Sequence, residues 1–195
     1  MSYLEKINTP SDLKSLSYAE LEALAGEIRQ TIIKTVSSNG GHLASNLGVV
    51  ELTLALHRSF DLPRDSIVFD VGHQCYVHKL LTGRKEVFDT LRQRDGITGF
   101  TNRSESEYDV FGAGHSGTSV SAAMGIASGD RLNKNNSYSV AVVGDGSLTN
   151  GMIYEALNNC TEDGEGVIVI LNDNEMSISK NVGAMSKYLS EFSNS

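Results

Sequence analysis

Val140-Ala-Val-Val-Gly-Asp145-Gly-Ser147 is a short apolar run that stops abruptly at a carboxylate between two glycines. The segment Val167-Ile-Val-Ile-Leu-Asn172-Asp-Asn174-Glu-Met176 repeats this pattern, because its apolar run also ends in side chains that carry oxygen. Short runs of β-favouring residues bounded by turn residues predict buried strands. Strands that are apolar on both faces are typical of a parallel sheet covered by helices, so we expect an α/β fold.

The polar ends of the two predicted strands are expected to face one crevice. The carboxyl ends of parallel strands meet at one edge of an open α/β sheet, and ligands bind there. Asp145 and Asn174 are separated by 29 positions (174 − 145), which leaves room for one helix, one turn and one strand. The spacing therefore predicts that both side chains lie at this edge, on neighbouring strands.

The chemistry of these strand ends favours a metal ion with bound phosphate. Asp145 offers an anionic oxygen, and Gly144 and Gly146 allow backbone N–H groups to approach a ligand. A helix predicted to begin near 148–149 favours an anion at its N-terminus. With the amide oxygen of Asn174, these groups form the oxygen-rich set that magnesium prefers. The alternative is that Asp145 caps the helix and Asn174 only forms a turn.

The sequence Gly144-Asp-Gly146 followed by Asn174 resembles the thiamine-diphosphate motif. Three flanking segments make the match more specific, namely Asp70-Val-Gly-His-Gln74, Tyr108-Asp-Val-Phe-Gly-Ala-Gly-His-Ser116 and Asn172-Asp-Asn-Glu-Met-Ser-Ile-Ser179. Together they resemble 1-deoxy-D-xylulose-5-phosphate synthases rather than ordinary transketolases. The resemblance extends from about Leu16 to Leu189, which is nearly the whole chain.

The resemblance implies a fold, a reaction and two cofactors. The fold would be the diphosphate-binding (PP) domain of transketolase-like enzymes, here an incomplete, mainly parallel sheet with helices on both faces. The family joins pyruvate, after decarboxylation, to D-glyceraldehyde 3-phosphate, and the product feeds the synthesis of isoprenoid precursors, thiamine and pyridoxal. The implied cofactors are thiamine diphosphate and Mg²⁺, so the chain would be part of a transferase.

The resemblance also implies which residues form the site. The Mg²⁺ ligands would be Asp145, Asn174 and the main-chain carbonyl of Met176. Hydrogen bonds to the diphosphate would come from Gly146 and Ser147. The segment Gly114-His115-Ser116 would also contact the diphosphate, although the same glycine-rich sequence could simply begin a helix without binding a ligand.

His42 and His73 each lie in a predicted loop directly after a glycine, where a histidine is often simply exposed. By resemblance, both line the pocket for cofactor and substrate. His42 would assist proton transfers, and His73 would contact the diphosphate or the reacting centre. A histidine can change its charge near neutral pH, which suits these roles. His57 and His78 are predicted to be structural.

Two other motifs compete for the segment Gly112-Ala-Gly-His-Ser-Gly117. It matches G-x-G-x-x-G, which binds dinucleotides when it follows a buried strand. The preceding segment 108–111 is short and half polar, and the natural acidic partner, Asp145, opens another loop, so the dinucleotide interpretation fails. The sequence also falls one residue short of a G-x-S-x-G nucleophile elbow, because Thr118 replaces glycine.

Composition and charge limit the classes of partner. The 195 residues suit one domain with a substantial core, and the net charge of −8 argues against nucleic acid and anionic membranes as partners. Cys75 and Cys160 give no disulfide framework, which favours a reducing compartment. The sequence shows neither a signal-peptide pattern nor an apolar run of the roughly eighteen residues that a membrane span requires. We therefore expect a cytoplasmic protein.

Hydrophobic periodicity predicts how the rest of the chain is organised. Residues 1–16 are expected to be a loosely ordered lead-in, and residues 17–195 the cofactor-binding domain. Ser17 and Glu20 form a capping-box pattern before a helix that ends at 39–41. Further helices are predicted over 49–60, 74–81, 84–93, 118–132 and 149–160, and strands over 66–70, 138–143 and 167–172.

Two polar segments receive simpler interpretations. The basic residues after the first strand are predicted to form one solvated face: Lys79, Arg84, Lys85, Arg92 and Arg94. Residues 95–111 are predicted to be an irregular loop that is too long for a mere connector, and such loops are often functional.

The chain is short for the family that it resembles. It extends 21 residues beyond Asn174 (195 − 174), and nothing in it matches the pyrimidine-binding or C-terminal domains of the family. We therefore expect a C-terminal pyrimidine-binding domain or subunit as a partner, and a homo-oligomer, with pyruvate and D-glyceraldehyde 3-phosphate as substrates. The alternatives are the N-terminal subunit of a split transketolase, or a non-catalytic fragment that binds magnesium and thiamine diphosphate.

Overall fold

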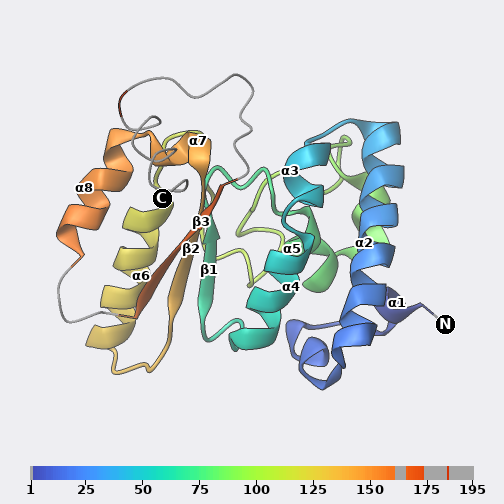
Figure 1. Ribbon diagram of the computed structural model, residues 1–195, viewed down its shortest axis with the longest axis horizontal. Helices are drawn as coiled ribbons and strands as arrows, with labels where there is room; N and C mark the ends of the chain where they lie inside the picture. The colour runs from blue at the N-terminus through green and yellow to red at the C-terminus, as the bar shows by residue number, and fades with distance from the viewer. Residues whose placement is uncertain (1, 161–165, 174–183, 185–195) are drawn as a thin grey trace.

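A parallel sheet of three strands forms the centre of the computed structural model, which describes residues 2–160, 166–173 and 184. The strands are β1 (Ser66–Phe69), β2 (Ser139–Gly144) and β3 (Val167–Asn172), in the order β1-β2-β3 (Figure 1). Phe69 lies beside Val142 in the sheet, and Gly144 lies beside Asn172. The carboxyl ends of the strands therefore reach one edge, as the sequence predicts.

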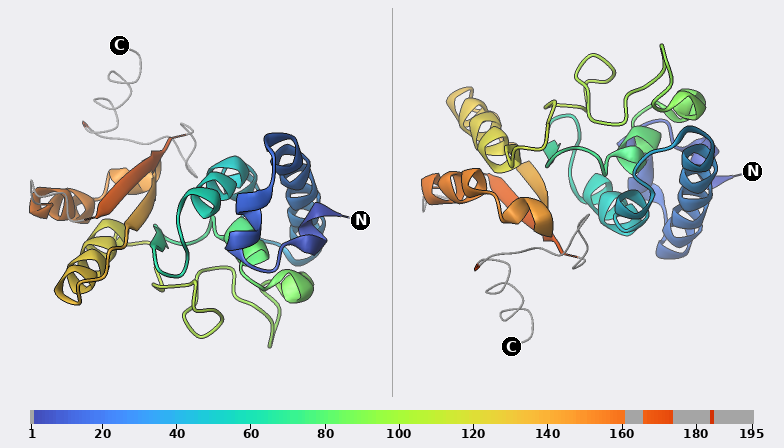
Figure 2. Two further views of the ribbon diagram at one scale, coloured as in Figure 1. Left: turned by 90° about the horizontal axis from the view of Figure 1, so that it is seen from below. Right: turned by 90° about the horizontal axis from the view of Figure 1, so that it is seen from above.

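Alternate strand residues point toward two different layers of helices. One face packs on α2 (Tyr18–Asn39), α4 (Val50–Ser59) and α5 (Tyr76–Leu81), and its buried strand residues are Ile67, Phe69, Val140 and Val142. The opposite face packs on α6 (Ser119–Leu132) and α8 (Gly151–Asn159), and its buried strand residues are Val68, Ala141 and Val143. Figure 2 shows the two groups of helices on opposite sides of the strands, which confirms the predicted α/β class.

The remaining helical segments are short. They are α1 (Tyr3–Lys6), η1 (Pro10–Ser15), α3 (Leu43–Leu47), η2 (Lys85–Thr90) and α7 (Asp145–Leu148). The predicted helix over 84–93 is thus a short 3₁₀ segment. The predicted helix over 149–160 starts at Gly151, because α7 and a turn occupy the residues directly after β2.

The helix α2 begins and ends as its sequence predicts. The backbone N–H of Ser17 donates to the carboxylate of Glu20 at 2.8 Å, and the N–H of Glu20 donates back to the Ser17 hydroxyl at 3.4 Å. This reciprocal pair satisfies two of the N–H groups that a helix start leaves without partners. The helix ends before Gly40, whose φ of 76° lies in the left-handed region that favours glycine.

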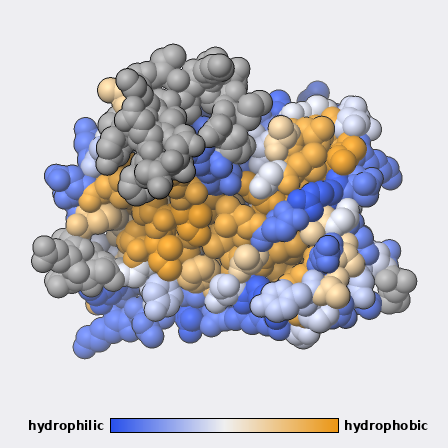
Figure 3. Space-filling model, in the orientation of Figure 1, coloured by the Kyte–Doolittle hydropathy of each residue, from blue (hydrophilic) through white to orange (hydrophobic). Residues whose placement is uncertain are grey.

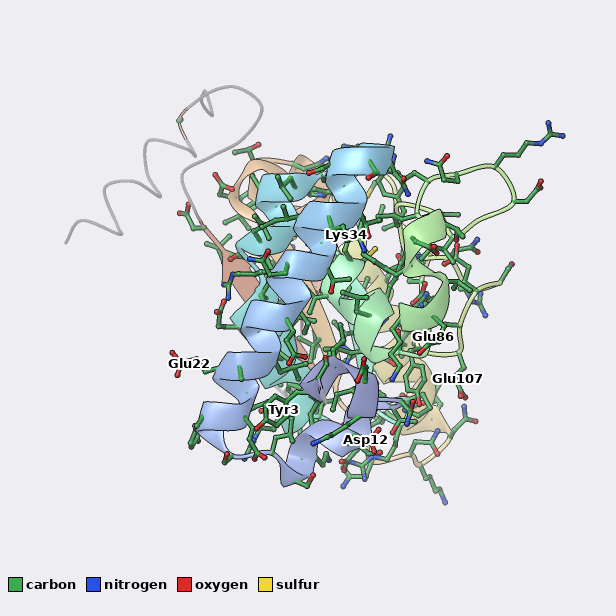
Figure 4. The ribbon with its side chains drawn as sticks, turned by 90° about the vertical axis from the view of Figure 1, so that its right-hand side faces the viewer. Tyr3, Asp12, Glu22, Lys34, Glu86 and Glu107 are labelled. Carbon is green, nitrogen blue, oxygen red and sulfur yellow. The ribbon has the colours of Figure 1, made fainter. Side chains whose placement is uncertain are left out.

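The first sixteen residues are packed rather than loosely ordered, which corrects the sequence-based expectation. Leu4, Ile7 and Leu13 belong to the larger hydrophobic core. The carboxylate of Glu27 on α2 accepts hydrogen bonds from the start of α1, including the backbone N–H of Leu4 at 2.8 Å. Figure 4 shows Tyr3 and Asp12 close to one end of α2, whereas Glu22 points away from the protein. Hydrophobic periodicity does not reveal the role of Glu27, because the backbone groups that it binds are distant from it in sequence.

The predicted solvated basic face is also wrong for two of its members. Lys79 and Arg84 are 0% and 4% exposed. Lys79 pairs with the carboxylate of Glu105, and Arg84 pairs with Asp109. Two acidic residues from the 95–111 loop thus compensate the charges that helix α5 and its following turn bring into the core, which makes their burial tolerable.

The segment 95–118 contains neither a helix nor a strand, as predicted for 95–111. Among the residues that the structure describes, no helix has both the length and the apolar character that crossing a bilayer requires. The strand β3 forms an edge of the described sheet and is only partly covered, so Leu171 is 41% exposed. Figure 3 shows a broad apolar surface in the region of this strand.

Candidate functional site

A pocket of about 590 Å³ lies at the carboxyl edge of the sheet. The segments that follow β1, β2 and α2, the end of β3 and the segment before α6 all contribute to its wall. The sequence-predicted residues in this wall are His42, His73, His115, Asp145, Gly146 and Ser147. The structure therefore brings together six predicted residues from four separate stretches of the chain. Of the other predicted residues, Asn174 and Met176 lie outside the described residues.

The end of β2 places Asp145 where the sequence predicts it. Asp145 directly follows the strand, begins α7 and is 8% exposed. A Cβ built on the neighbouring Gly144 would meet no atom within 4 Å, so this glycine faces open space. Across the register, Asn172 lies beside Gly144 and also lines the pocket. A carboxylate and an amide therefore both line the pocket at this edge.

The glycine-rich segment before α6 contributes one wall of the pocket. His115 lines it, whereas Gly114 and Ser116 are exposed next to it and are not among the lining residues. Gly117 has a φ of 63°, and a Cβ there would lie 2.8 Å from the side chain of Asn150. Close approach to α8 thus requires glycine at this position. No strand precedes the segment, so the dinucleotide-binding interpretation remains excluded.

The end of β1 carries His73 into the same pocket. Asp70, directly after β1, is 1% exposed, and its carboxylate accepts the backbone N–H of Ser119 at 3.1 Å. This bond caps the start of α6 and ties it to the end of β1. Gly72 has a φ of 82° and lets the chain turn sharply after the strand. The turn directs the next residue, His73, toward the pocket.

Three histidine rings meet at the pocket, although they are distant in sequence. The ring centroids of His42 and His73 are 5.3 Å apart, and those of His73 and His115 are 6.4 Å apart. Phe100, from the 95–111 loop, lies 5.8 Å from the His42 ring. The irregular loop therefore supports the histidine cluster, a role that no local sequence signal revealed.

Burial keeps two of these histidines neutral at pH 7. Desolvation is the main reason why the pKa of His73 falls to about 4, and the nearby His42 and His115 add to the effect. Burial, with Arg92 and His115 nearby, also lowers the pKa of His42. The Nδ1 atoms of His42 and His73 are buried and have no hydrogen-bond partner within the described part of the chain. Each Nδ1 atom therefore has unused hydrogen-bonding capacity beside the pocket.

The remaining histidines, His57 and His78, form a separate buried chain of hydrogen bonds, which confirms their predicted structural role. His78 Nε2 lies 3.0 Å from the Asp109 carboxylate, and His78 Nδ1 lies 3.0 Å from His57 Nε2. A carboxylate only accepts, so each histidine carries its proton on Nε2. Asp109 also accepts the backbone N–H of Asn102 at 2.7 Å, so this chain anchors the 95–111 loop beside the pocket.

The comparisons with known proteins agree with this architecture. A transketolase from Leishmania mexicana superposes with a TM-score of 0.65 at 20% sequence identity, over 87% of this chain and 30% of that one. The chain therefore has the fold of the corresponding part of a transketolase.

Sequence comparison identifies the family. The family model described as 1-deoxy-D-xylulose-5-phosphate synthase matches residues 4–195. The synthase of Caldanaerobacter subterraneus is 60% identical over 188 residues, and that of Syntrophomonas wolfei is 61% identical over 186 residues. The chain belongs to the 1-deoxy-D-xylulose-5-phosphate synthase family and corresponds to its N-terminal region. These matches cover 96% and 95% of this chain but 30% and 29% of the two relatives.

Proposed function

We propose that this chain forms the part of a 1-deoxy-D-xylulose-5-phosphate synthase that holds Mg²⁺ and the diphosphate of thiamine diphosphate. The complete reaction would condense pyruvate with D-glyceraldehyde 3-phosphate and release CO₂. The observation that carries the proposal is the convergence of Asp145 and the histidines 42, 73 and 115 on one pocket at the carboxyl edge of the sheet.

The residues present suit the proposed cofactor. A pocket of about 590 Å³ has the size of a cofactor site, and Gly144 leaves open space at its wall. The Asp145 carboxylate is a hard oxygen ligand of the kind Mg²⁺ prefers. The buried Nδ1 atoms of His42 and His73 have no hydrogen-bond partner among the described residues. When bound, the thiazolium ring of the cofactor supplies the electron sink for decarboxylation and carbon–carbon bond formation.

Each residue of the pocket has a proposed role. Asp145 would hold the metal ion together with Asn174 and the main-chain carbonyl of Met176, and Asn172 is a further amide at the same edge. Hydrogen bonds to the diphosphate would come from Gly146, Ser147, His73 and the segment 114–116. His42, neutral at pH 7, would accept and return protons at the reacting centre.

The complete activity would need domains outside this sequence. Because the chain spans about 30% of the relatives that it matches, we propose a C-terminal pyrimidine-binding domain or subunit as its partner and a homodimer as the working assembly. The same observation favours a second candidate, a fragment that binds magnesium and thiamine diphosphate without turnover. Pyruvate-dependent product formation in a mixture with the remaining domains separates the two.

Calorimetric titration of thiamine diphosphate into the chain, with and without Mg²⁺, tests the proposed site. We expect binding that requires Mg²⁺ and that Asp145→Asn weakens by at least about thirtyfold, because a lost charged ligand costs on the order of 2–3 kcal/mol. Asp89→Asn is the matched control, since Asp89 is exposed on η2. Binding that is unaffected by Mg²⁺, or equal weakening by both substitutions, would contradict the proposal.

A further inference from the structure

Asn46 links the loops that carry His42 and His73. This residue of α3 is 0% exposed, and its side chain makes three hydrogen bonds to backbone groups. Its amide nitrogen donates to the carbonyl of His42 at 2.6 Å and to the carbonyl of His73 at 2.9 Å. Its oxygen accepts the N–H of Tyr76 at 2.8 Å. One side chain thus joins segments that are distant in sequence.

The three partners determine how the Asn46 amide is oriented. Backbone carbonyls only accept hydrogen bonds and a backbone N–H only donates, so the nitrogen must face the histidines and the oxygen must face Tyr76. Both N–H donors of the amide are used. An aspartate of the same shape could still accept from Tyr76, but it would leave the carbonyls of His42 and His73 without donors.

Tyr76 adds a second tie to the same loop. Its hydroxyl accepts the backbone N–H of His42 at 3.3 Å, so both backbone polar groups of His42 are held. A Cβ on Gly41 would lie 2.7 Å from this hydroxyl oxygen, which shows how closely the loop approaches the ring. Tyr76 is fully buried at the start of α5, so the hydroxyl that binds His42 belongs to a side chain fixed in the core.

We propose that Asn46 is a positioning residue that holds the rings of His42 and His73 together before any ligand enters the pocket. The centroid distance of 5.3 Å between the rings is the arrangement that it maintains. The geometry is independent of the proposed function, but the catalytic meaning of the pair rests on that function. Preorganised groups of this kind reduce the rearrangement that a reaction requires.

Nuclear magnetic resonance of the ligand-free chain can test this role directly. The sequence contains five histidines, so single His→Gln variants can assign every ring. We expect a nuclear Overhauser contact between the rings of His42 and His73. The buried pair His57 and His78, with centroids 5.0 Å apart, provides an internal reference for a folded core.

The variant Asn46→Asp should lose the contact between His42 and His73 and keep the contact between His57 and His78. In Asn46→Ala, which adds no charge, we also expect the pKa of His73 to rise from about 4, because His42 adds to the lowering that burial causes. A folded Asn46→Asp chain with an unchanged contact between His42 and His73 would overturn the proposal.

Asn39→Asp is the matched control. The Asn39 amide also donates to two backbone carbonyls, those of Asp89 at 2.7 Å and Leu91 at 3.0 Å, and it lies only three residues before His42. This variant should keep both ring contacts. Loss of the His42–His73 contact here too would overturn the proposal, because general destabilisation would then explain the effect.

If Asn46→Asp does not fold, Asn46→Ala replaces it, and the same two ring contacts are measured in that variant. Failure of both variants to fold, with Asn39→Asp folded, would overturn the proposal, since Asn46 would then be required by the whole domain. All of these measurements are made without cofactor. Failure of the proposed cofactor binding is therefore detected separately, by calorimetry on the unaltered chain.

Discussion

The guanidinium of Arg84 donates two parallel hydrogen bonds to the carboxylate of Asp109, with Nη1–Oδ2 at 2.7 Å and Nη2–Oδ1 at 2.8 Å. Both residues are buried, and His78 donates to the same carboxylate. Because Asp109 belongs to the 95–111 loop and Arg84 follows α5, this pair fixes the loop to the helical core. The loop in turn carries Phe100 to the histidine cluster.

Removing the Asp109 carboxylate should strongly destabilise the chain. In Asp109→Ala the buried Arg84 and His78 lose their partner, and we expect the free energy of unfolding to fall by roughly 3–5 kcal/mol. Urea unfolding measures this change. Asp61→Ala is the control, because the exposed pairs of Asp61 with Arg64 and Lys14 should contribute less than about 1 kcal/mol each. If both substitutions lowered the free energy of unfolding equally, the buried pair would contribute no more to stability than the exposed pairs.

Acidification from pH 7 to pH 5 should lower the stability of the chain. Burial is the first cause that lowers the pKa values of His42, His57, His73 and His78. Unfolded histidines take up protons near pH 6.5, whereas the folded chain holds these rings neutral to lower pH. Stability is therefore lost as pH falls from about 6.5 toward the folded pKa values. For His73, with a folded pKa of about 4, the loss begins well above that value.

Urea unfolding at pH 7, 6 and 5 tests this linkage. His73 is partly exposed, so solvent screening limits its contribution to roughly 1 kcal/mol at pH 5. The variant His73→Gln should reduce the difference between pH 7 and pH 5. The lowered pKa of Asp109 adds a second loss only below about pH 4. An unfolding free energy that is constant between pH 7 and pH 5 would contradict the prediction.

Gly117→Ala should destabilise the start of α6, whereas Gly125→Ala should not. Gly117 has a φ of 63°, and its added Cβ would lie 2.8 Å from Asn150, so we expect a loss of more than about 1 kcal/mol. Gly125 lies inside α6 and a Cβ there would meet nothing within 4 Å, so alanine should add about 0.5–1 kcal/mol. Thermal unfolding measures both changes: we expect Gly117→Ala to lower the stability of the chain and Gly125→Ala to raise it. A stabilising Gly117→Ala would show that the backbone relaxes there.

The apolar surface near β3 should make the chain associate as its concentration rises. Leu171 is 41% exposed on this edge strand of the described sheet, and large exposed apolar surfaces mark interaction sites (Figure 3). Leu171→Glu should reduce association in sedimentation velocity experiments. Leu132→Glu, at the end of α6, is the control because this leucine is 81% exposed but lies outside the sheet. A monomeric chain at every concentration would rule out association through this surface.

The strands and the placement of Asp145 at a strand end could be predicted from the sequence, because both depend on local patterns. The strand predicted over 167–172 coincides with β3, and Asp145 lies at the end of β2 as expected. An uninterrupted apolar run indicates a strand buried on both faces, and a carboxylate between glycines breaks it. These signals are contained within a few consecutive residues, so they do not require knowledge of the tertiary contacts.

The sequence by itself therefore determined the α/β class, the strand ends and the family resemblance. Only the tertiary structure decided that Lys79 and Arg84 are buried, that Leu13 joins the core, and that Asn46 connects His42 to His73. The reason is physical: a charge or an amide can be buried only where a partner compensates it, and these partners come from distant segments. Local periodicity carries no information about such partners, and folding alone brings them together.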